Sequence, residues 1–65
     1  MKYEEYMSIR NMILRDLEQY QSELIAWYNH EEWIYDVLDW ETVTYYEREL
    51  IPSLNSDLEN LEWYL

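Results

Sequence analysis

Apolar residues recur at steps of mostly three and four through the first 28 residues, which is the pattern of one helical face. They are Tyr3, Tyr6, Met7, Ile13, Leu14, Leu17, Tyr20, Leu24, Trp27 and Tyr28. The pattern predicts a helix from Lys2 to Tyr28, about 40 Å long at 1.5 Å per residue. A helix of that length needs a second helix along it, from this chain or from a second copy. Asn29 and His30 are the predicted turn.

Two further apolar stripes follow the turn. A second helical run is predicted from Glu31 to Leu38, with Trp33, Ile34, Val37 and Leu38 on one side. A third stripe comprises Val43, Tyr46, Leu50, Leu54, Leu58, Leu61 and Leu65. Val37 and Val43 are out of phase, because six steps of about 100° do not return to the same face. We therefore expect a break between Asp39 and Thr42, with one of these two residues as an N-cap.

Pro52 interrupts the third stripe, and proline inside a helix removes a backbone donor and costs about 3 kcal/mol. The stripe keeps its phase across Pro52, which favours a kinked helix or a short break. In the rival interpretation the helix ends near Leu50 and restarts later, with Ser56 and Glu59 as a capping box.

The composition supports a single all-α domain covering residues 1–65, built from two to three helices. Glycine is absent, which argues against tight β-hairpins and phosphate-binding loops. Cysteine is also absent, so disulfides and thiolate metal sites are excluded. Because so short a chain has a thin core, we expect the bundle to be completed by homodimerisation. Neither a signal peptide nor a membrane span is expected, so the chain is predicted to be soluble and cytoplasmic.

Charge is distributed unevenly along the chain. The net charge is −11, and residues 31–65 contribute −9 of it through ten acids and one base, Arg48. Such a charge repels nucleic acid and anionic membranes and favours basic partners. The aromatic content of 18% argues against a disordered acidic tail.

The sequence offers little for catalysis or cofactor binding. His30 is the single histidine, no cysteine is present, and no serine has a second base nearby in sequence. The acidic run from Glu31 to Glu41 lacks the glycine of a calcium-binding loop, and Trp27 stands where a Glu-x-x-His pair would need its glutamate. We expect neither an enzyme nor a dedicated metal or cofactor site.

Carboxylates interleaved with Tyr and Trp instead suggest a protein-binding surface. The aromatics are four Trp and eight Tyr with no Phe, and Trp and Tyr are enriched at interfaces. On a helix the unpaired carboxylates would form a row resembling nucleic-acid phosphates. In the simpler interpretation they form an ordinary solubilising face, and Tyr3, Tyr6, Tyr20, Trp27 and Trp33 cover a thin core or a dimer seam. The predicted partner-binding residues are Glu31, Glu32, Tyr35, Asp36, Asp39, Trp40, Glu41, Glu47 and Glu49.

The chain resembles small acidic phage-encoded inhibitors of nucleic-acid-processing enzymes in its size, in the acidic run from Glu31 to Glu41 and in the later acids Asp57, Glu59 and Glu62. That group includes anti-CRISPR proteins, anti-restriction proteins and inhibitors of uracil-DNA glycosylase. The resemblance implies inhibition by DNA mimicry, in which the protein binds the basic nucleic-acid-binding surface of a host protein. No motif defines the group, so no individual residue role follows from it. The alternative is a non-enzymatic helical adaptor or structural oligomer.

Overall fold

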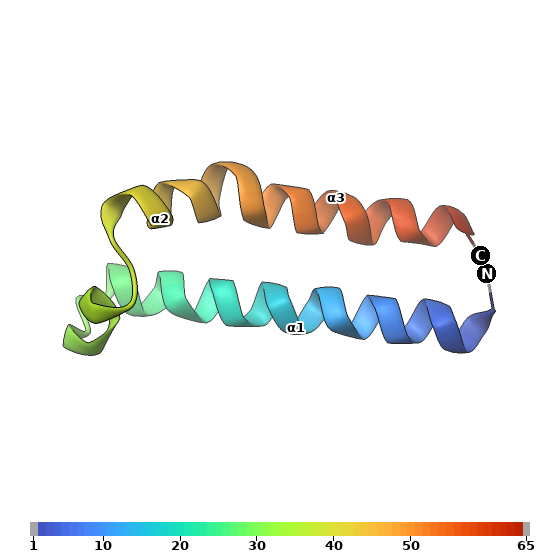
Figure 1. Ribbon diagram of the computed structural model, residues 1–65, viewed down its shortest axis with the longest axis horizontal. Helices are drawn as coiled ribbons and strands as arrows, with labels where there is room; N and C mark the ends of the chain where they lie inside the picture. Colours follow the sequence, from blue (N-terminus) through green and yellow to red (C-terminus); the bar gives the residue numbers. More distant parts are fainter. Residues whose placement is uncertain (1, 65) are drawn as a thin grey trace.

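The computed structural model describes residues 2–64 and shows a helical hairpin about twice as long as it is wide, with extents of 43 × 19 × 14 Å (Figure 1). The first helix runs antiparallel to a second, shorter helical segment, and the start of the first helix and the end of the second segment lie at the end opposite the turn. The all-α prediction is confirmed. The elements are α1 (Tyr3–Tyr28), the 3-10 helix η1 (Glu32–Asp36), α2 (Trp40–Tyr45), the π-helical turn η2 (Tyr46–Leu50), α3 (Ile51–Leu61) and the 3-10 turn η3 (Glu62–Tyr64).

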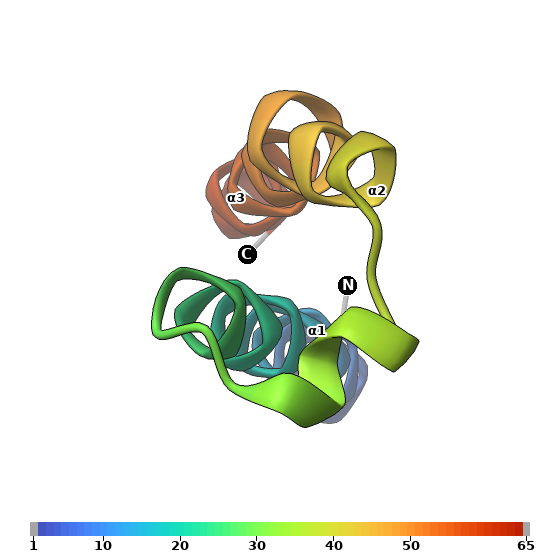
Figure 2. The ribbon, with the colours of Figure 1, turned by 90° about the vertical axis from the view of Figure 1, so that its left-hand side faces the viewer.

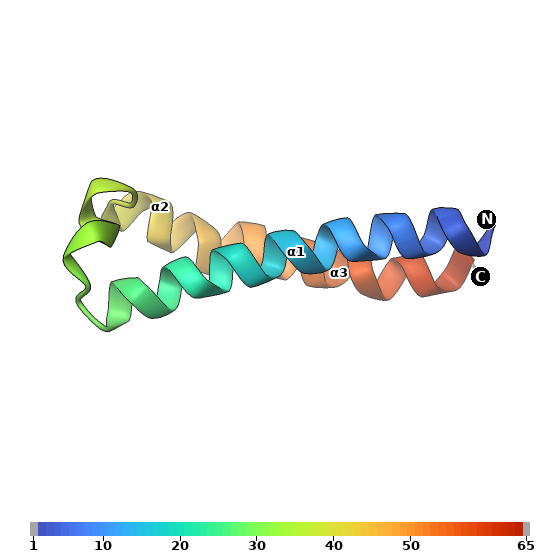
Figure 3. The ribbon, with the colours of Figure 1, turned by 90° about the horizontal axis from the view of Figure 1, so that it is seen from below.

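Helix α1 has nearly the predicted bounds. Part of the apolar stripe that predicted it packs on the second helix, with Tyr6 and Leu17 buried, whereas Leu14 stays exposed. Ala26 is buried at the turn end, in a cluster with residues of η1 and α2. Glu4 and Glu5 lie in the first turn, where carboxylates interact favourably with the helix dipole. Figure 3 shows α1 crossing the second helix at a shallow angle, as expected when heptad-like stripes pack together.

The C-terminus of α1 ends in a Schellman motif. The His30 N–H donates to the Trp27 carbonyl at 3.1 Å, and the Glu31 N–H donates to the Ala26 carbonyl at 3.1 Å. The motif requires a left-handed residue at His30, which has φ 58°. The predicted turn at Asn29 and His30 is confirmed, with histidine in the conformation that glycine usually supplies.

The segment after the turn differs from its prediction. An eight-residue helical run was expected from Glu31 to Leu38, whereas the structure has a five-residue 3-10 helix, η1, with Glu31 extended. Ile34 and Leu38 are buried, and their contacts with α1 and α2 hold this short segment in place. Tertiary contacts therefore replace the longer helical ladder that the pattern suggested.

The second helical segment begins where predicted and continues through Pro52. Asp39 is its N-cap, and the Asp39 carboxylate accepts a hydrogen bond from the Thr42 N–H at 2.8 Å. The turn before Pro52 widens into η2, where the Ile51 N–H donates to the Tyr46 carbonyl, five residues back. The rival restart at Ser56 and Glu59 is wrong, because both residues lie inside α3.

The tightest packing lies at the turn end. Ala26, Ile34, Leu38 and Val43 form one buried cluster, against which Leu24, Trp27 and Tyr46 pack. Figure 2 looks along the hairpin from this end and shows the chain crossing from α1 to α2 through η1. In the described residues, no helix has the length and apolar content needed to cross a membrane.

Candidate functional site

The structure gathers most of the predicted partner-binding residues at the turn end of the hairpin. Seven of them lie on η1 or directly before it, at the junction after it, or on the first turn of α2, and Glu47 and Glu49 follow on η2. All nine are exposed. We call the five turn-end carboxylates the acidic cap: Glu31, Glu32, Asp36, Asp39 and Glu41.

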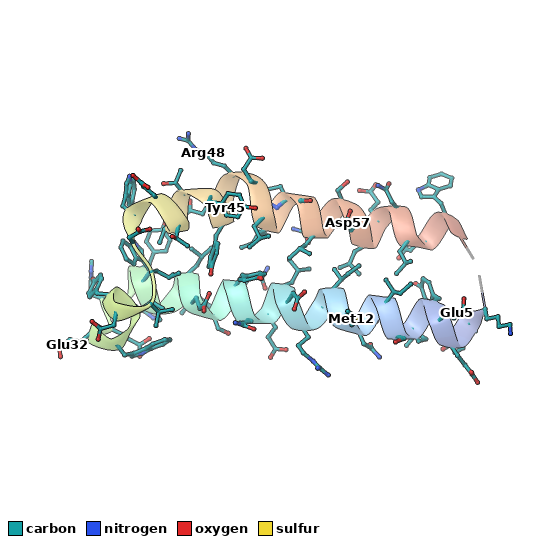
Figure 4. The ribbon with its side chains drawn as sticks, viewed as in Figure 1. Glu5, Met12, Glu32, Tyr45, Arg48 and Asp57 are labelled. Carbon is teal, nitrogen blue, oxygen red and sulfur yellow. The ribbon has the colours of Figure 1, made fainter. Side chains whose placement is uncertain are left out.

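The acidic cap is not the straight helical row that the sequence suggested. Glu31 and Asp39 have extended backbones, and the 3-10 helix between them turns more tightly than an α-helix. The carboxylates therefore gather at the end of the hairpin and do not follow one helical face, and the Glu32 side chain projects from this end (Figure 4). No Lys or Arg occurs in sequence between Arg15 and Arg48, and the Arg48 side chain points away from α1. The cap thus carries an uncompensated negative field.

Exposed apolar side chains accompany the acidic cap. Trp40 is 67% exposed on the first turn of α2, and Trp33 and Val37 are exposed on and just after η1. The simpler interpretation of the sequence predicts that Trp33 covers a core or a dimer seam, whereas about half of its surface is open to solvent in this chain. Its position beside the buried Ile34 explains this, since neighbours on a short helix point in different directions.

Tyr35 is held more firmly than a free anchor would be. Its hydroxyl lies 2.9 Å from Nδ1 of His30. Its ring packs edge-on against Trp27, with centroids 5.2 Å apart. These contacts connect η1 to the end of α1 and fix the direction of the acidic cap, so Tyr35 combines a structural role with partial exposure.

Two of the predicted carboxylates are also used within the fold. Hydrogen bonds from the Thr42 side chain and backbone lower the pKa of Asp39. Glu47 accepts a hydrogen bond from the Tyr28 hydroxyl, which joins η2 to α1. This hydrogen bond, with partial desolvation and the charge of Glu47, raises the pKa of Tyr28. Among the hydrogen bonds described, none involves the side chains of the other four cap members, Glu31, Glu32, Asp36 and Glu41.

A polar contact in the middle of the hairpin was missed by the sequence analysis. The Tyr20 and Tyr46 rings pack with centroids 4.9 Å apart. Burial, together with the hydrogen bond and charge of Glu23, raises the pKa of Tyr46 to about 12. One Glu23 oxygen is buried without a hydrogen-bond partner. Sequence gave no signal for this contact, because Glu23 lies at the edge of the apolar stripe.

Other surfaces offer less. An open depression lined by Glu4, Glu5, Ser8 and Ile9 lies at the start of α1, at the opposite end from the acidic cap. Among residues 2–64, no three His, Cys, Asp or Glu side chains are grouped so that they could hold a metal ion. Comparison of the chain with protein-family models, curated proteins and solved structures finds no match.

Proposed function

We propose that this protein is an inhibitor that inserts its turn end into the basic nucleic-acid-binding surface of a partner protein and blocks access of DNA or RNA. One observation supports this most directly: five exposed carboxylates and the exposed Trp33 and Trp40 share residues 31–41 at the best-packed end of the hairpin, with no Lys or Arg nearby in sequence. A basic groove built for phosphates would attract this surface, whereas nucleic acid itself would be repelled.

The two kinds of side chain have different roles in the proposed complex. Carboxylates at the rim accelerate association with a basic surface, and their effect weakens as salt screens them. Desolvated aromatic anchors slow dissociation. Trp40 is the strongest candidate anchor, because it is widely exposed yet stands on a helix whose start is fixed by the Asp39 cap.

The shape of the cap specifies how the mimicry would work. The carboxylates gather at one end of a rod and do not follow its length, so the hairpin would enter a groove end-on. Packing beneath the cap, through Ile34, Leu38 and Val43, keeps the charges in place before binding. A preorganised surface avoids much of the ordering cost of association.

The decisive experiment neutralises three charges at either end of the molecule. The turn variant carries Glu31→Gln, Glu32→Gln and Asp36→Asn, none of which has a described role in the fold. The matched control carries Asp57→Asn, Glu59→Gln and Glu62→Gln on the second helical segment, so both variants have the same net charge. Each is immobilised and exposed to heparin-enriched nucleic-acid-binding proteins from a lysate, at low and high salt.

We expect the wild type and the control to retain a basic protein that high salt releases, and the turn variant to lose it. The captured protein is then tested for binding to labelled duplex DNA or RNA, with added hairpin as competitor. Equal capture by both variants would contradict the proposed site. A partner that binds nucleic acid equally well with the hairpin attached would contradict inhibition.

The second candidate function is a non-enzymatic helical adaptor or structural oligomer. The exposed apolar residues of α1 favour it, among them Ile25 and Leu14. An apolar contact responds little to salt, so a partner retained equally at low and high salt, and by the turn variant, would support this candidate over inhibition.

A further inference from the structure

Helix α1 leaves one side of its apolar stripe largely exposed in the hairpin, although the Tyr28 hydroxyl reaches Glu47 on η2. Met7, Leu14 and Tyr28 are separated by multiples of seven residues and share one side of the helix, with Tyr3 and Ile25 beside them. At about 100° per residue, these residues lie roughly 20–100° around the helix from the buried Tyr6 and Leu17, with Tyr28 nearest to them and Met7 and Ile25 farthest. We call these five residues the α1 seam. Met7 is half-buried, and the other four are exposed, Ile25 by 61%.

The hairpin also exposes more surface than a compact protein of its size. Its accessible surface is 5199 Å², whereas a compact monomer of 8.3 kDa exposes about 4600 Å². Its radius of gyration is 14.2 Å, against about 10.7 Å for a compact chain of this length. The excess surface, roughly 600 Å², approaches the roughly 800 Å² that each partner buries in a stable dimer.

The charges select one orientation for a pair. Residues 29–41 carry five acids and no Lys or Arg. Parallel pairing through α1 would place two acidic caps together and would be repulsive. Antiparallel pairing keeps the two caps at opposite ends of the pair, each near the first turn of α1 of the other copy, where Lys2 precedes Glu4 and Glu5. The antiparallel pair therefore avoids the repulsion between caps.

We propose that the α1 seam binds a second copy of this chain in antiparallel orientation, which produces a four-helix assembly with acidic caps at opposite ends. The seam of each copy covers that of the other, with Met7 near the partner's Tyr28. The tests of this proposal use the purified chain alone, so their outcome does not depend on the proposed inhibitory function.

The first test compares Ile25→Glu with Met12→Glu by analytical ultracentrifugation over a range of protein concentrations. Met12 is 62% exposed on α1, like Ile25, but lies about 160° around the helix from the seam. We expect the wild type and Met12→Glu to be dimers and Ile25→Glu to be a helical monomer. A monomeric wild type, or equal association of both variants, would overturn the proposal. If Ile25→Glu loses helical content, Leu14→Gln decides between the same two outcomes.

The second test determines orientation. The chain has no cysteine, so Met7→Cys and Tyr28→Cys each introduce a single thiol, and a short bis-maleimide reports which thiols are adjacent. Residues 7 and 28 are about 32 Å apart on one helix. In an antiparallel pair neither variant cross-links alone, whereas a refolded mixture gives the cross-linked heterodimer. Efficient cross-linking of either variant alone, or none in the mixture, would contradict antiparallel pairing.

Discussion

His30 provides the sharpest test of the turn, because a glycine at this position should make the hairpin more stable than an alanine does. The residue has φ 58° at the position after the α1 cap, where a side chain with a Cβ atom is strained. Its imidazole also lies 2.9 Å from the Tyr35 hydroxyl. His30→Ala and His30→Gly both remove that contact. They differ only in the Cβ atom and in the freedom of the unfolded chain.

The expected magnitude follows from these two differences. A left-handed conformation costs a residue with a Cβ about 1–2 kcal/mol. Glycine loses about 0.5–1 kcal/mol more conformational freedom on folding than alanine. The glycine variant should therefore be more stable than the alanine variant by roughly 0.5–1 kcal/mol. For a domain of this size, that difference corresponds to about 3–6 °C in the midpoint of thermal unfolding.

Urea unfolding followed by helical circular dichroism measures the difference, at one fixed chain concentration because association affects apparent stability. Ser22, exposed in the middle of α1, provides the control. There Ser22→Gly should be less stable than Ser22→Ala by about 1 kcal/mol, the usual order in a helix. If His30→Gly and His30→Ala followed the same order as the control pair, the left-handed Schellman turn would be refuted.

Three further predictions concern the second helical segment. The folded-state pKa of Tyr46 is about 12, above its ordinary value of 10.0, so Tyr46 ionises first in the unfolded chain as pH rises. The free energy of unfolding, measured with urea at each pH, should therefore be constant below pH 10 and fall between pH 10 and 12, and it should fall less in Tyr46→Phe. Because the pKa of Asp39 is lowered in the fold, its carboxylate stabilises the hairpin above its ordinary pKa of 3.8, and this stabilisation is lost as pH falls through the folded-state pKa. At neutral pH Asp39→Ala should lower the melting temperature more than Asp39→Asn, which keeps a capping oxygen, and equal melting temperatures would contradict the cap. Pro52→Ala should change the free energy of unfolding by less than the roughly 3 kcal/mol that proline costs in a regular helix, because η2 already displaces the backbone before Pro52. Nuclear magnetic resonance of this variant should still detect the π-turn.

Sequence periodicity was most informative where local and tertiary preferences agree. The apolar stripe placed α1 to within one residue of its observed start, and Asp39 was one of two proposed caps. Residues 31–38 were harder, because a short apolar run fits an α-helix and a 3-10 helix equally well. The outcome there depends on how Ile34 and Leu38 fit against the small Ala26 side chain, which the sequence pattern does not specify.

The π-turn had no signal in the apolar stripe. Val43 and Leu61 are 18 residues apart, which is five full turns of a regular helix, so the stripe is in phase without an insertion. The stripe therefore predicted a helix that continues through Pro52 but not the widening of the backbone before it. Pro52 itself was the local cue, because proline lacks the N–H that a regular helix would use.

For the candidate site, the sequence identified which side chains are exposed at the turn end but not their arrangement. Carboxylates are rarely buried, so the exposure of the acidic cap followed from residue type. Their gathering at the hairpin end depends on the extended backbones of Glu31 and Asp39. The separation of Trp33, which is exposed, from Trp27, which packs against the core, depends on contacts between segments distant in sequence.

The wide turn η2 holds one residue more than a regular α-helix would hold over the same length. Removal of one residue there, Glu49 for example, would let the backbone return to a regular α-helix. Because the π-turn absorbs the extra residue locally, Leu54, Leu58 and Leu61 would still face α1. A one-residue deletion within η2 should therefore be tolerated far better than one within α3, which would rotate the residues after it by about 100°.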